Sequence, residues 1–225
     1  MARIDDPRSV ASPSTPDQVR WLAAVRAQRH PLTAPLVPTP TASDGRERLA
    51  RVVLMRHGDA DWPLVNGRRL RGGANDLVPL TPGGVAQIEQ QADLLAVHDF
   101  QYVVSSPMTR ALQSASIAAQ RLGVQLRVEV DLHEWVPDLT YLWTEPCQVD
   151  RALDAMRAGV APEEFNGPPF ERESDLRARV KAALRRHAAT RPVLVVTHGV
   201  VIWSVTGRRI ETAEHVWWGS DAPEG

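Results

Sequence analysis

Two histidines and two arginines follow apolar runs of the kind that form buried strands. In chain order they are Arg56, His57, Arg110 and His198, and a glycine comes directly after each histidine. An arginine fork donates paired hydrogen bonds to phosphate oxygens, and a neutral imidazole can attack phosphorus and hold it as phosphohistidine. The set therefore indicates phosphoryl transfer. Because a phosphohistidine is labile, water could complete the reaction without a metal.

The apolar runs predict four strands, with amphipathic helices between them. Strands that are apolar throughout and alternate with helices are typical of an α/β fold whose mostly parallel sheet has helices on both faces. Ligands bind beyond the carboxyl ends of such strands, so the residues that follow the strands should meet in one crevice. The predicted strands are 52–55, 102–105, 125–130 and 193–196.

Start and stop signals predict three of the helices. Thr81-Pro82 marks the start of a helix that reaches Leu95. Ser106-Pro107 marks the start of a second helix, and Gly123 ends it. A third helix is predicted to start at Ser174. Helices commonly have Pro at their first position and Gly just past their last one.

Composition divides the chain into two regions. Residues 1–50 are rich in Pro, Ser, Thr and Ala, and we interpret them as a Pro-rich N-terminal arm with a short helix over 15–27. Residues 51–225 carry the alternating pattern and are predicted to form one catalytic domain. Within it, residues 132–170 are rich in Pro and lack periodicity, so we expect a lid-like insertion there.

Overall composition excludes several classes of protein. The chain has 225 residues, 43% of them hydrophobic, and a net charge of −1, so no global field recruits nucleic acid or an anionic membrane. Its single cysteine, Cys147, cannot form an internal disulfide, and no zinc-ligand spacing occurs. With no apolar signal or membrane-spanning segment either, we expect a cytoplasmic protein that needs no metal and no cofactor.

Five motifs in the right order resemble those of the histidine phosphatase superfamily, also called phosphoglycerate mutase-like. They are the Arg-His-Gly signature, a helix start, a second-arginine motif, an acid motif and a second-histidine motif. Five ordered motifs are far more specific than one. The resemblance covers roughly residues 51 to 205 and implies a phosphoglycerate mutase-like fold. The matching segments are "LMRHGDADW", "PLTPGGVAQ", "VVSSPMTRALQSA", "LHEW" and "VLVVTHG".

The resemblance also implies a role for each site residue. His57 is the nucleophile, Arg56 and Arg110 hold the phosphoryl group, His198 assists them in catalysis and phosphate binding, and Glu134 donates a proton to the leaving oxygen. Other acids stay open at this point. Asp59 and Asp61 lie closer to the nucleophile along the chain, and either could replace Glu134.

The chain departs from the mutase-like members of this family in several places. Pro63 stands where they have an Asn that helps to bind phosphate, and Asn66 or Arg68 could take over that contact. The Thr-Gly-Trp and Arg-x-Tyr elements of mutases are replaced by other residues. The chain after His198 is short where the family commonly adds another strand, so we expect none there. The replacing segments are Gly72-Gly73-Ala74 and Trp135-Val136-Pro137.

Aromatic residues flank the predicted site motifs. Trp62, Trp135, Tyr141 and Trp143 are the nearest, and seven of the chain's aromatic residues are Trp. Most buried aromatic side chains simply form core. Their position around the motifs nevertheless suggests that Trp62 and Trp135 contact substrate, and that the leaving group is bulky and partly apolar.

These observations predict a metal-independent phosphatase that hydrolyses a phosphate monoester through a phosphohistidine. Its partner is expected to be a small-molecule phosphate ester rather than nucleic acid or a membrane, and the sequence allows a homodimer. Two alternatives remain. One is a phosphoglycerate-type mutase, and the other is a non-catalytic phospholigand-binding protein, which Pro63 and the Pro-rich arm would suit.

Overall fold

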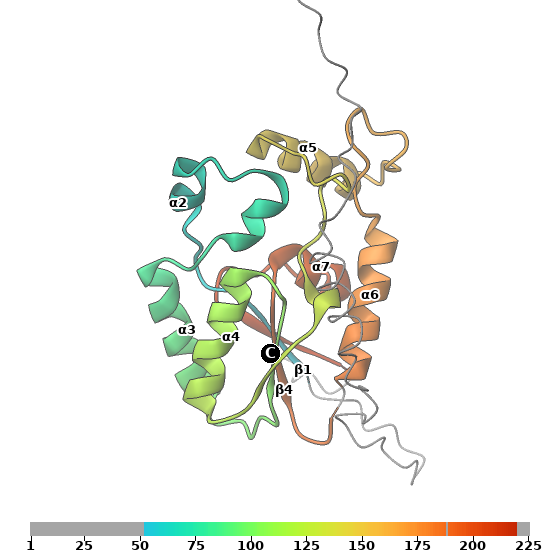
Figure 1. Ribbon diagram of the computed structural model, residues 1–225. Coiled ribbons are helices and arrows are strands. Elements are labelled where there is room, and N and C mark those ends of the chain that lie inside the picture. Colours follow the sequence, from blue (N-terminus) through green and yellow to red (C-terminus); the bar gives the residue numbers. More distant parts are fainter. Residues whose placement is uncertain (1–51, 188, 220–225) are drawn as a thin grey trace, which may run out of the picture. The chain divides into compact units, whose positions relative to one another are not determined.

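The computed structural model describes residues 52–187 and 189–219, which form a five-stranded sheet between two layers of helices (Figure 1). The predicted arm over 1–50 and its short helix lie outside the described residues. The α/β fold with a mostly parallel, helix-covered sheet is as predicted.

The sheet has the strand order β3-β2-β4-β1-β5. β1, β2, β3 and β4 run parallel, and β5 pairs antiparallel with β1 at the edge. In the register of the two central strands, Leu54 lies beside Val195 and Arg56 beside Thr197. The strand bounds are Val52–Arg56 (β1), Val103–Ser105 (β2), Leu126–Val128 (β3), Val193–Thr197 (β4) and His215–Trp218 (β5).

Each face of the sheet has its own hydrophobic core, because alternate residues of a strand point to opposite faces. Val52 and Leu54 of β1 pack in the core beneath α6 and α7, whereas Val53 and Met55 pack beneath α3 and α4. Figure 1 shows the two helix pairs on opposite sides of the strands. The bounds are Pro82–Leu95 (α3), Thr109–Leu122 (α4), Glu173–Arg186 (α6) and Gly199–Thr206 (α7).

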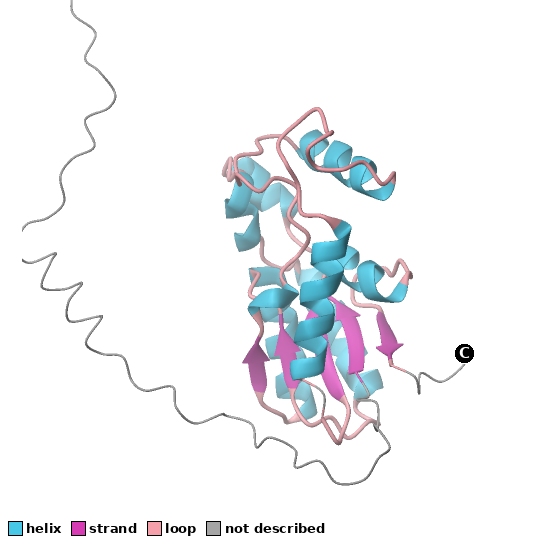
Figure 2. Ribbon diagram, turned by 90° about the vertical axis from the view of Figure 1, so that its right-hand side faces the viewer, coloured by secondary structure: helices cyan, strands magenta, loops and turns pink. Residues whose placement is uncertain are grey.

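Four further elements complete the fold: α2 (Trp62–Gly67), α5 (Pro146–Arg157) and the 3-10 helices η1 (Gly72–Leu77) and η2 (Val130–Leu132). The arrowheads of the parallel strands point toward the end of the molecule where α2 and α5 lie (Figures 1 and 2). These two helices therefore lie beyond the carboxyl ends of the strands, where ligands bind in such folds.

Helix boundaries agree with the sequence signals in part. The Thr81 hydroxyl caps α3 by accepting from the Gly84 N–H at 2.9 Å, and Gly123 ends α4 with a φ of 67°. The prediction that α4 starts at Ser106-Pro107 was wrong, because α4 begins at Thr109. The Ser106 hydroxyl instead pairs with His198.

The expectation of no strand after His198 was also wrong. β5 forms from His215–Trp218 and covers the free edge of β1. This strand is only four residues long and alternates weakly in polarity, so the sequence pattern did not distinguish it from a loop. It matters for the site because the Ala213 N–H, just before β5, donates to the His57 carbonyl at 3.1 Å.

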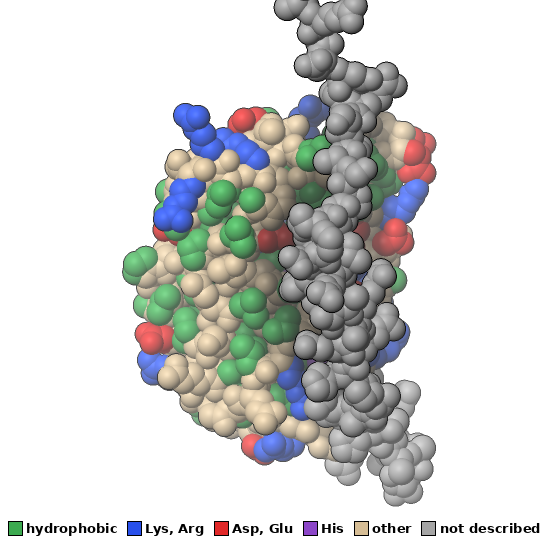
Figure 3. Space-filling view, viewed as in Figure 1, with side chains coloured by type: hydrophobic (Ala, Val, Ile, Leu, Met, Phe, Trp, Pro, Cys, Tyr) green, Lys and Arg blue, Asp and Glu red, His purple; other side chains and the backbone are tan. Residues whose placement is uncertain are grey.

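Charges of both signs are mixed on the surface. In Figure 3, Lys and Arg side chains alternate with Asp and Glu side chains around the border of the visible face. This mixture agrees with the net charge of −1. None of the helices in the described part of the chain combines the length and the apolarity that crossing a bilayer requires.

Two glycines let the loop after β1 lie directly on the first turn of α3. A Cβ on Gly58 would lie 2.5 Å from the Gly84 carbonyl oxygen, and a Cβ on Gly84 would lie 2.2 Å from the Asp59 carbonyl oxygen. Both contacts are to backbone, which cannot turn aside as a side chain can. The glycine after His57 is therefore required by the close approach of two backbones.

Gly84→Ala should destabilise the fold, because the added methyl group meets the Asp59 backbone. We expect the free energy of unfolding to fall by about 1–3 kcal/mol, the usual cost of overpacking. Gly67→Ala is the matched control, since a Cβ there meets nothing within 4 Å and Ala is the better helix former. Urea denaturation of both variants measures the difference. Equal stability of the two would contradict the close packing of Gly84 on Asp59.

Candidate active site

The four predicted phosphate-site residues come together where the parallel strands end. Arg56 closes β1 and His57 follows it, His198 follows β4, and Arg110 lies in the first turn of α4. His57 and Arg110 are 6% and 5% exposed and His198 is fully buried. The rings of the two histidines lie 5.2 Å apart between centroids.

His57 is held with a free lone pair directed at Arg110. Its Nδ1 lies 2.7 Å from the carbonyl oxygen of Gly58, which can only accept, so Nδ1 carries the proton and Nε2 does not. Nε2 accepts from the Arg110 Nε–H at 3.2 Å. Burial, aided by the charges of Arg110 and Arg56, lowers the pKa of His57 to about 3. The imidazole is therefore uncharged at neutral pH, and its Nε2 keeps a lone pair.

Arg110 is fixed from several sides. Its Nη1 donates to the Asn75 carbonyl at 3.4 Å, and its guanidinium lies 5.5 Å from the centre of the Trp62 ring. The buried Ser114 hydroxyl donates to the Arg110 carbonyl at 2.7 Å and accepts from the Gly58 N–H at 3.1 Å. Ser114 thus ties the loop after β1 to the helix that carries Arg110.

One N–H donor of Arg56 has no hydrogen-bond partner among the described residues. Its Nη1 donates to the Ile210 carbonyl at 3.0 Å, whereas its buried Nε–H has no partner among the described residues. Gly199, the glycine after His198, lies against this guanidinium, since a Cβ there would lie 3.4 Å from the Arg56 Nε, an ordinary contact. An unpaired N–H on a cation is suited to an anion.

His198 is a second neutral imidazole. Its Nε2 lies 2.7 Å from the Ser106 hydroxyl, and its buried Nδ1 has no partner in the described part of the chain. Burial and the charge of Arg110 lower the pKa of His198 well below its ordinary value. His198 is therefore uncharged at neutral pH, and a phosphate dianion beside it would favour its protonated form.

Glu134 is the predicted acid that reaches the cavity. Its Oε1 accepts from its neighbour Trp135 N–H at 2.9 Å, and its Oε2 from the Val200 N–H in the first turn of α7 at 3.4 Å. Burial raises the pKa of this carboxyl, although these N–H groups and the charges of Arg110 and Arg56 oppose the shift. A raised pKa suits a group that must hold a proton near neutral pH.

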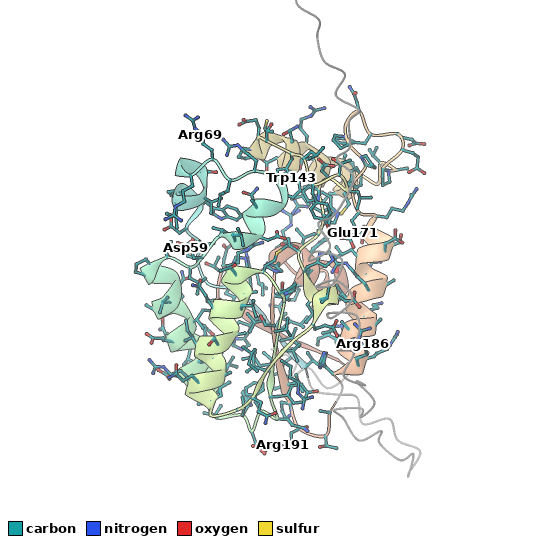
Figure 4. The ribbon with its side chains drawn as sticks, in the orientation of Figure 1. Asp59, Arg69, Trp143, Glu171, Arg186 and Arg191 are labelled. Atoms are coloured by element: carbon teal, nitrogen blue, oxygen red, sulfur yellow. The ribbon has the colours of Figure 1, made fainter. Side chains whose placement is uncertain are left out.

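The two alternative acids, Asp59 and Asp61, lie outside the lining of the cavity. Asp59 is exposed near the first turn of α3, where it accepts from the Thr81 hydroxyl at 3.0 Å (Figure 4). Asp61 caps α2 by accepting from the Leu64 N–H at 3.0 Å. Neither lines the cavity, but Asp76, which the sequence analysis did not consider, does. Burial raises the pKa of Asp76 as well.

A cavity of about 650 Å³ adjoins Arg110 and Glu134. Four aromatic side chains line it, together with Asn66, Arg71 and residues of α5. Arg68, one of the two candidates to replace the missing phosphate-binding Asn, is exposed and does not line the cavity. Pro63 is the second residue of α2, in the first turn, where a backbone N–H has no partner within the helix. The four aromatic residues are Trp62, Trp135, Tyr141 and Trp143.

Metal ligands are not grouped in this site. Within residues 52–187 and 189–219, no three His, Cys, Asp or Glu side chains lie together as the ligands of a metal ion would. The polar groups that surround His57 are instead guanidinium groups, hydroxyls and backbone N–H groups. Such groups can bind and neutralise a phosphoryl group by themselves.

A family model decides the affiliation of the chain. The model of the histidine phosphatase superfamily (branch 1) matches residues 52–222. The chain belongs to the histidine phosphatase superfamily. The members of this superfamily are enzymes, and they include phosphatases and phosphoglycerate mutase-like proteins. The fold class predicted from the motifs is confirmed by this match.

Two curated relatives illustrate the range of activities in the superfamily. A probable phosphoglycerate mutase, GpmB, from Proteus mirabilis (strain HI4320) is 29% identical over 161 residues, which cover 68% of this chain and 72% of the relative. A 2-carboxy-D-arabinitol-1-phosphatase from Triticum aestivum is 30% identical over 116 residues, covering 52% of this chain and 21% of the relative. Both a mutase and a phosphatase are thus among the relatives.

Solved structures share the fold. A mycobacterial glucosyl-3-phosphoglycerate phosphatase in complex with VO3 superimposes with a TM-score of 0.56 at 22% identity, covering 76% of this chain and 97% of the other. A phosphoglycerate mutase from Bacillus anthracis str. Sterne gives a TM-score of 0.56 at 21% identity, covering 75% and 87%. At these identities the likeness supports the histidine phosphatase fold and not a particular substrate.

The neutral, buried His57 of this histidine phosphatase should make the fold sensitive to acid. Unfolding lets His57 regain its ordinary pKa of 6.5, above the folded value of about 3. The unfolded chain therefore binds the proton first, and the free energy of unfolding falls as pH drops from 6.5 toward 3. Between pH 7 and pH 5 this decrease should be smaller in His57→Asn than in the wild type by about 2 kcal/mol.

Urea denaturation at both pH values measures this difference. The comparison uses the change with pH within each protein, so a constant effect of the substitution on stability cancels. An identical pH dependence in both proteins would show that His57 is not held neutral in the folded state.

Proposed function

We propose that the protein is a metal-independent phosphatase that hydrolyses a phosphate monoester through a phosphohistidine on His57. The observation that supports this most directly is the hydrogen bond from His57 Nδ1–H to the Gly58 carbonyl, which leaves Nε2 unprotonated beside Arg110. A nucleophile with its lone pair fixed beside phosphate-binding cations is what covalent phosphoryl transfer requires.

The first half of the reaction transfers the phosphoryl group to the enzyme. The substrate phosphate takes over the Arg110 Nε–H from His57 and the unpaired Nε–H of Arg56. The Nε2 lone pair then forms a bond to phosphorus while the bond to the leaving oxygen breaks. Glu134 gives its proton to that oxygen, and the arginines and His198 neutralise the charge on the equatorial oxygens.

The second half returns the enzyme to its starting state. Glu134, now ionised, takes a proton from a water molecule, whose oxygen attacks phosphorus. The bond between phosphorus and Nε2 breaks, and inorganic phosphate leaves. The same carboxyl thus serves as acid and then as base, so the two halves together consume one water and release one alcohol and one phosphate.

A phosphoglycerate-type mutase is the second candidate, because a probable mutase is among the relatives. The absence of the mutase elements in Gly72-Gly73-Ala74 and Trp135-Val136-Pro137 favours the phosphatase. A mutase assay primed with a bisphosphate distinguishes the two. The convergence of Arg56, His57 and Arg110 on one buried site also favours an enzyme over a non-catalytic phospholigand-binding protein.

We further propose that the substrate is a small-molecule phosphate ester with a bulky, partly apolar leaving group. The four aromatic side chains of the 650 Å³ cavity support this, since they line the same space as Glu134. Trp143 also favours a leaving group that carries a hydrogen-bond acceptor. Its buried indole N–H has no partner among the described residues, and an acceptor on the leaving group would supply one.

We also propose a role for the 132–170 segment, a place for the N-terminal arm and a cellular location. Residues 132–170 act as a lid-like insertion, because much of the cavity wall, including Trp143 and α5, comes from this segment. The Pro-rich arm over 1–50 precedes the catalytic domain. The single cysteine, Cys147, supports a cytoplasmic location.

Glu134→Gln should slow alkyl phosphates far more than nitrophenyl phosphate. An alkoxide needs a proton as it departs, whereas a nitrophenolate leaves readily without one. We expect kcat/KM for an alkyl phosphate to fall about a hundredfold or more, the usual contribution of general acid catalysis. Asp59→Asn is the control and should leave both substrates nearly unchanged. Equal losses on both substrates would make Glu134 structural, and a selective loss in the Asp59 variant would move the acid there.

The aromatic cavity predicts a preference among leaving groups. Wild-type kcat/KM should be higher for 2-naphthyl phosphate than for 3-phosphoglycerate, and Trp143→Phe should lower the naphthyl value by about tenfold through lost aromatic contact. Trp217→Phe in β5 is the matched control, because Trp217 does not line the cavity. A wild-type preference for the small polar acid would contradict the proposed substrate class.

A further inference from the structure

The segment that carries Glu134 has little regular structure to hold it. It follows η2, which ends at Leu132, and precedes α5, which begins at Pro146. A loop without a helix or a sheet ladder must satisfy its backbone groups through side chains or water. Such a segment would place an acid loosely unless other parts of the fold held it.

Arg179 of α6 holds this segment by its backbone. The guanidinium Nη1 donates to the Asp131 carbonyl at 2.6 Å and to the His133 carbonyl at 2.9 Å, and Nη2 donates to the Glu134 carbonyl at 3.3 Å. The Leu132 carbonyl between them accepts from the Thr197 hydroxyl at 2.8 Å. Four successive carbonyls are thus fixed by side chains from α6 and β4.

Glu171 completes the arrangement from the other side. It pairs with Arg179 at 2.6 and 2.9 Å, and its Oε2 also accepts from the Val136 N–H at 3.2 Å. Its backbone carbonyl accepts the Trp135 indole N–H at 2.7 Å, and its own N–H donates to the Val136 carbonyl at 2.9 Å. Glu171, labelled in Figure 4 near the upper end of α6, therefore fixes the two residues after Glu134.

The ion pair is well shielded from water. The side chains of Arg179 and Glu171 are 14% and 11% exposed. Neighbouring arginines of α6 differ in this respect, since Arg177 is 48% exposed and pairs with Glu173 on its own helix. A buried pair contributes little net stability compared with apolar packing, so stability alone does not account for this one. The Glu171 carboxylate also balances the charge of Arg179. The pair that holds the loop therefore adds no net charge beside Glu134.

We propose that Arg179, paired with Glu171, is the positioning residue for the acid Glu134. The pair fixes the backbone on both sides of Glu134, and the carboxyl is thereby aimed from the loop into the cavity beside Arg110. Arg179 itself does not line the cavity and touches no substrate. This inference rests on the proposed function, because it assumes that Glu134 protonates a leaving group.

Arg179→Lys tests this role while keeping the positive charge. A single ammonium cannot reproduce the planar fork that reaches three carbonyls and two carboxylate oxygens at once. We expect kcat/KM for an alkyl phosphate to fall roughly tenfold to a hundredfold, as a displaced acid would cause. The value for 4-nitrophenyl phosphate should change less than about threefold, because that leaving group needs no acid.

Arg177→Lys is the matched control on the same helix. Arg177 also donates to a distant backbone carbonyl, that of Ser204 at 2.8 Å, but it does not contact the Glu134 segment. It should keep the wild-type ratio of the two substrates. Glu171→Gln provides a second variant in case Arg179→Lys folds poorly, and it should show the same selective loss.

The outcomes separate this inference from the function on which it rests. A selective loss on alkyl phosphates in either variant, absent in Arg177→Lys, supports the positioning role. Equal losses on both substrates, or no loss on either, would overturn it and make the pair purely structural. If the wild type releases no phosphate from either ester, the proposed function has failed rather than the role of Arg179.

Discussion

The hydrogen bond between His57 Nδ1 and the Gly58 carbonyl is the interaction on which the site depends. It decides which ring nitrogen carries the proton, so Nε2 faces Arg110 as a lone pair. The loop can make this bond because β1 ends at the crevice and Gly58 packs without a side chain against α3. The His57 backbone is fixed in turn, since its N–H donates to the Thr197 carbonyl of β4 at 3.0 Å.

Burial and charge then set the protonation states of the other groups. Burial keeps both histidines neutral, because it disfavours the charged ring, and the positive charge of Arg110 acts in the same direction on both. The same burial acts in the opposite direction on Glu134 and raises the pKa of its carboxyl. One crevice thus favours a neutral base and a protonated acid, which is the pairing that phosphoryl transfer to a histidine uses.

Most of the fold, and the meeting of the candidate phosphate-binding residues, could be predicted from the sequence for definite physical reasons. Fully buried parallel strands are apolar throughout, and residues at their carboxyl ends must converge, so Arg56, His57 and His198 could be brought together from the pattern alone. The Thr81 cap and the Gly123 stop were equally local signals. Motif order supplied Arg110 and Glu134.

Other features depend on contacts between distant residues, which a local pattern does not record. Arg179 lies 45 residues from Glu134, and nothing in its own helix distinguishes it from neighbouring arginines. Asp76 likewise lies in no motif, and the contact that Ser114 makes with Gly58 cannot be read from the segment that contains it. β5 was missed because its four residues form a strand only through pairing with β1. The sequence could not distinguish Asn66 from Arg68, because their different positions relative to the cavity depend on how α2 is placed.

The most direct test of the central claim is to trap the phosphoryl group on the enzyme. A phosphate monoester labelled with ³²P is mixed with the protein, quenched in alkali within milliseconds, and the labelled peptide is identified by mass spectrometry. The account predicts acid-labile, alkali-stable label on His57 and none in His57→Ala. Phosphate release by the wild type with no label on His57, or label on another residue, would contradict it.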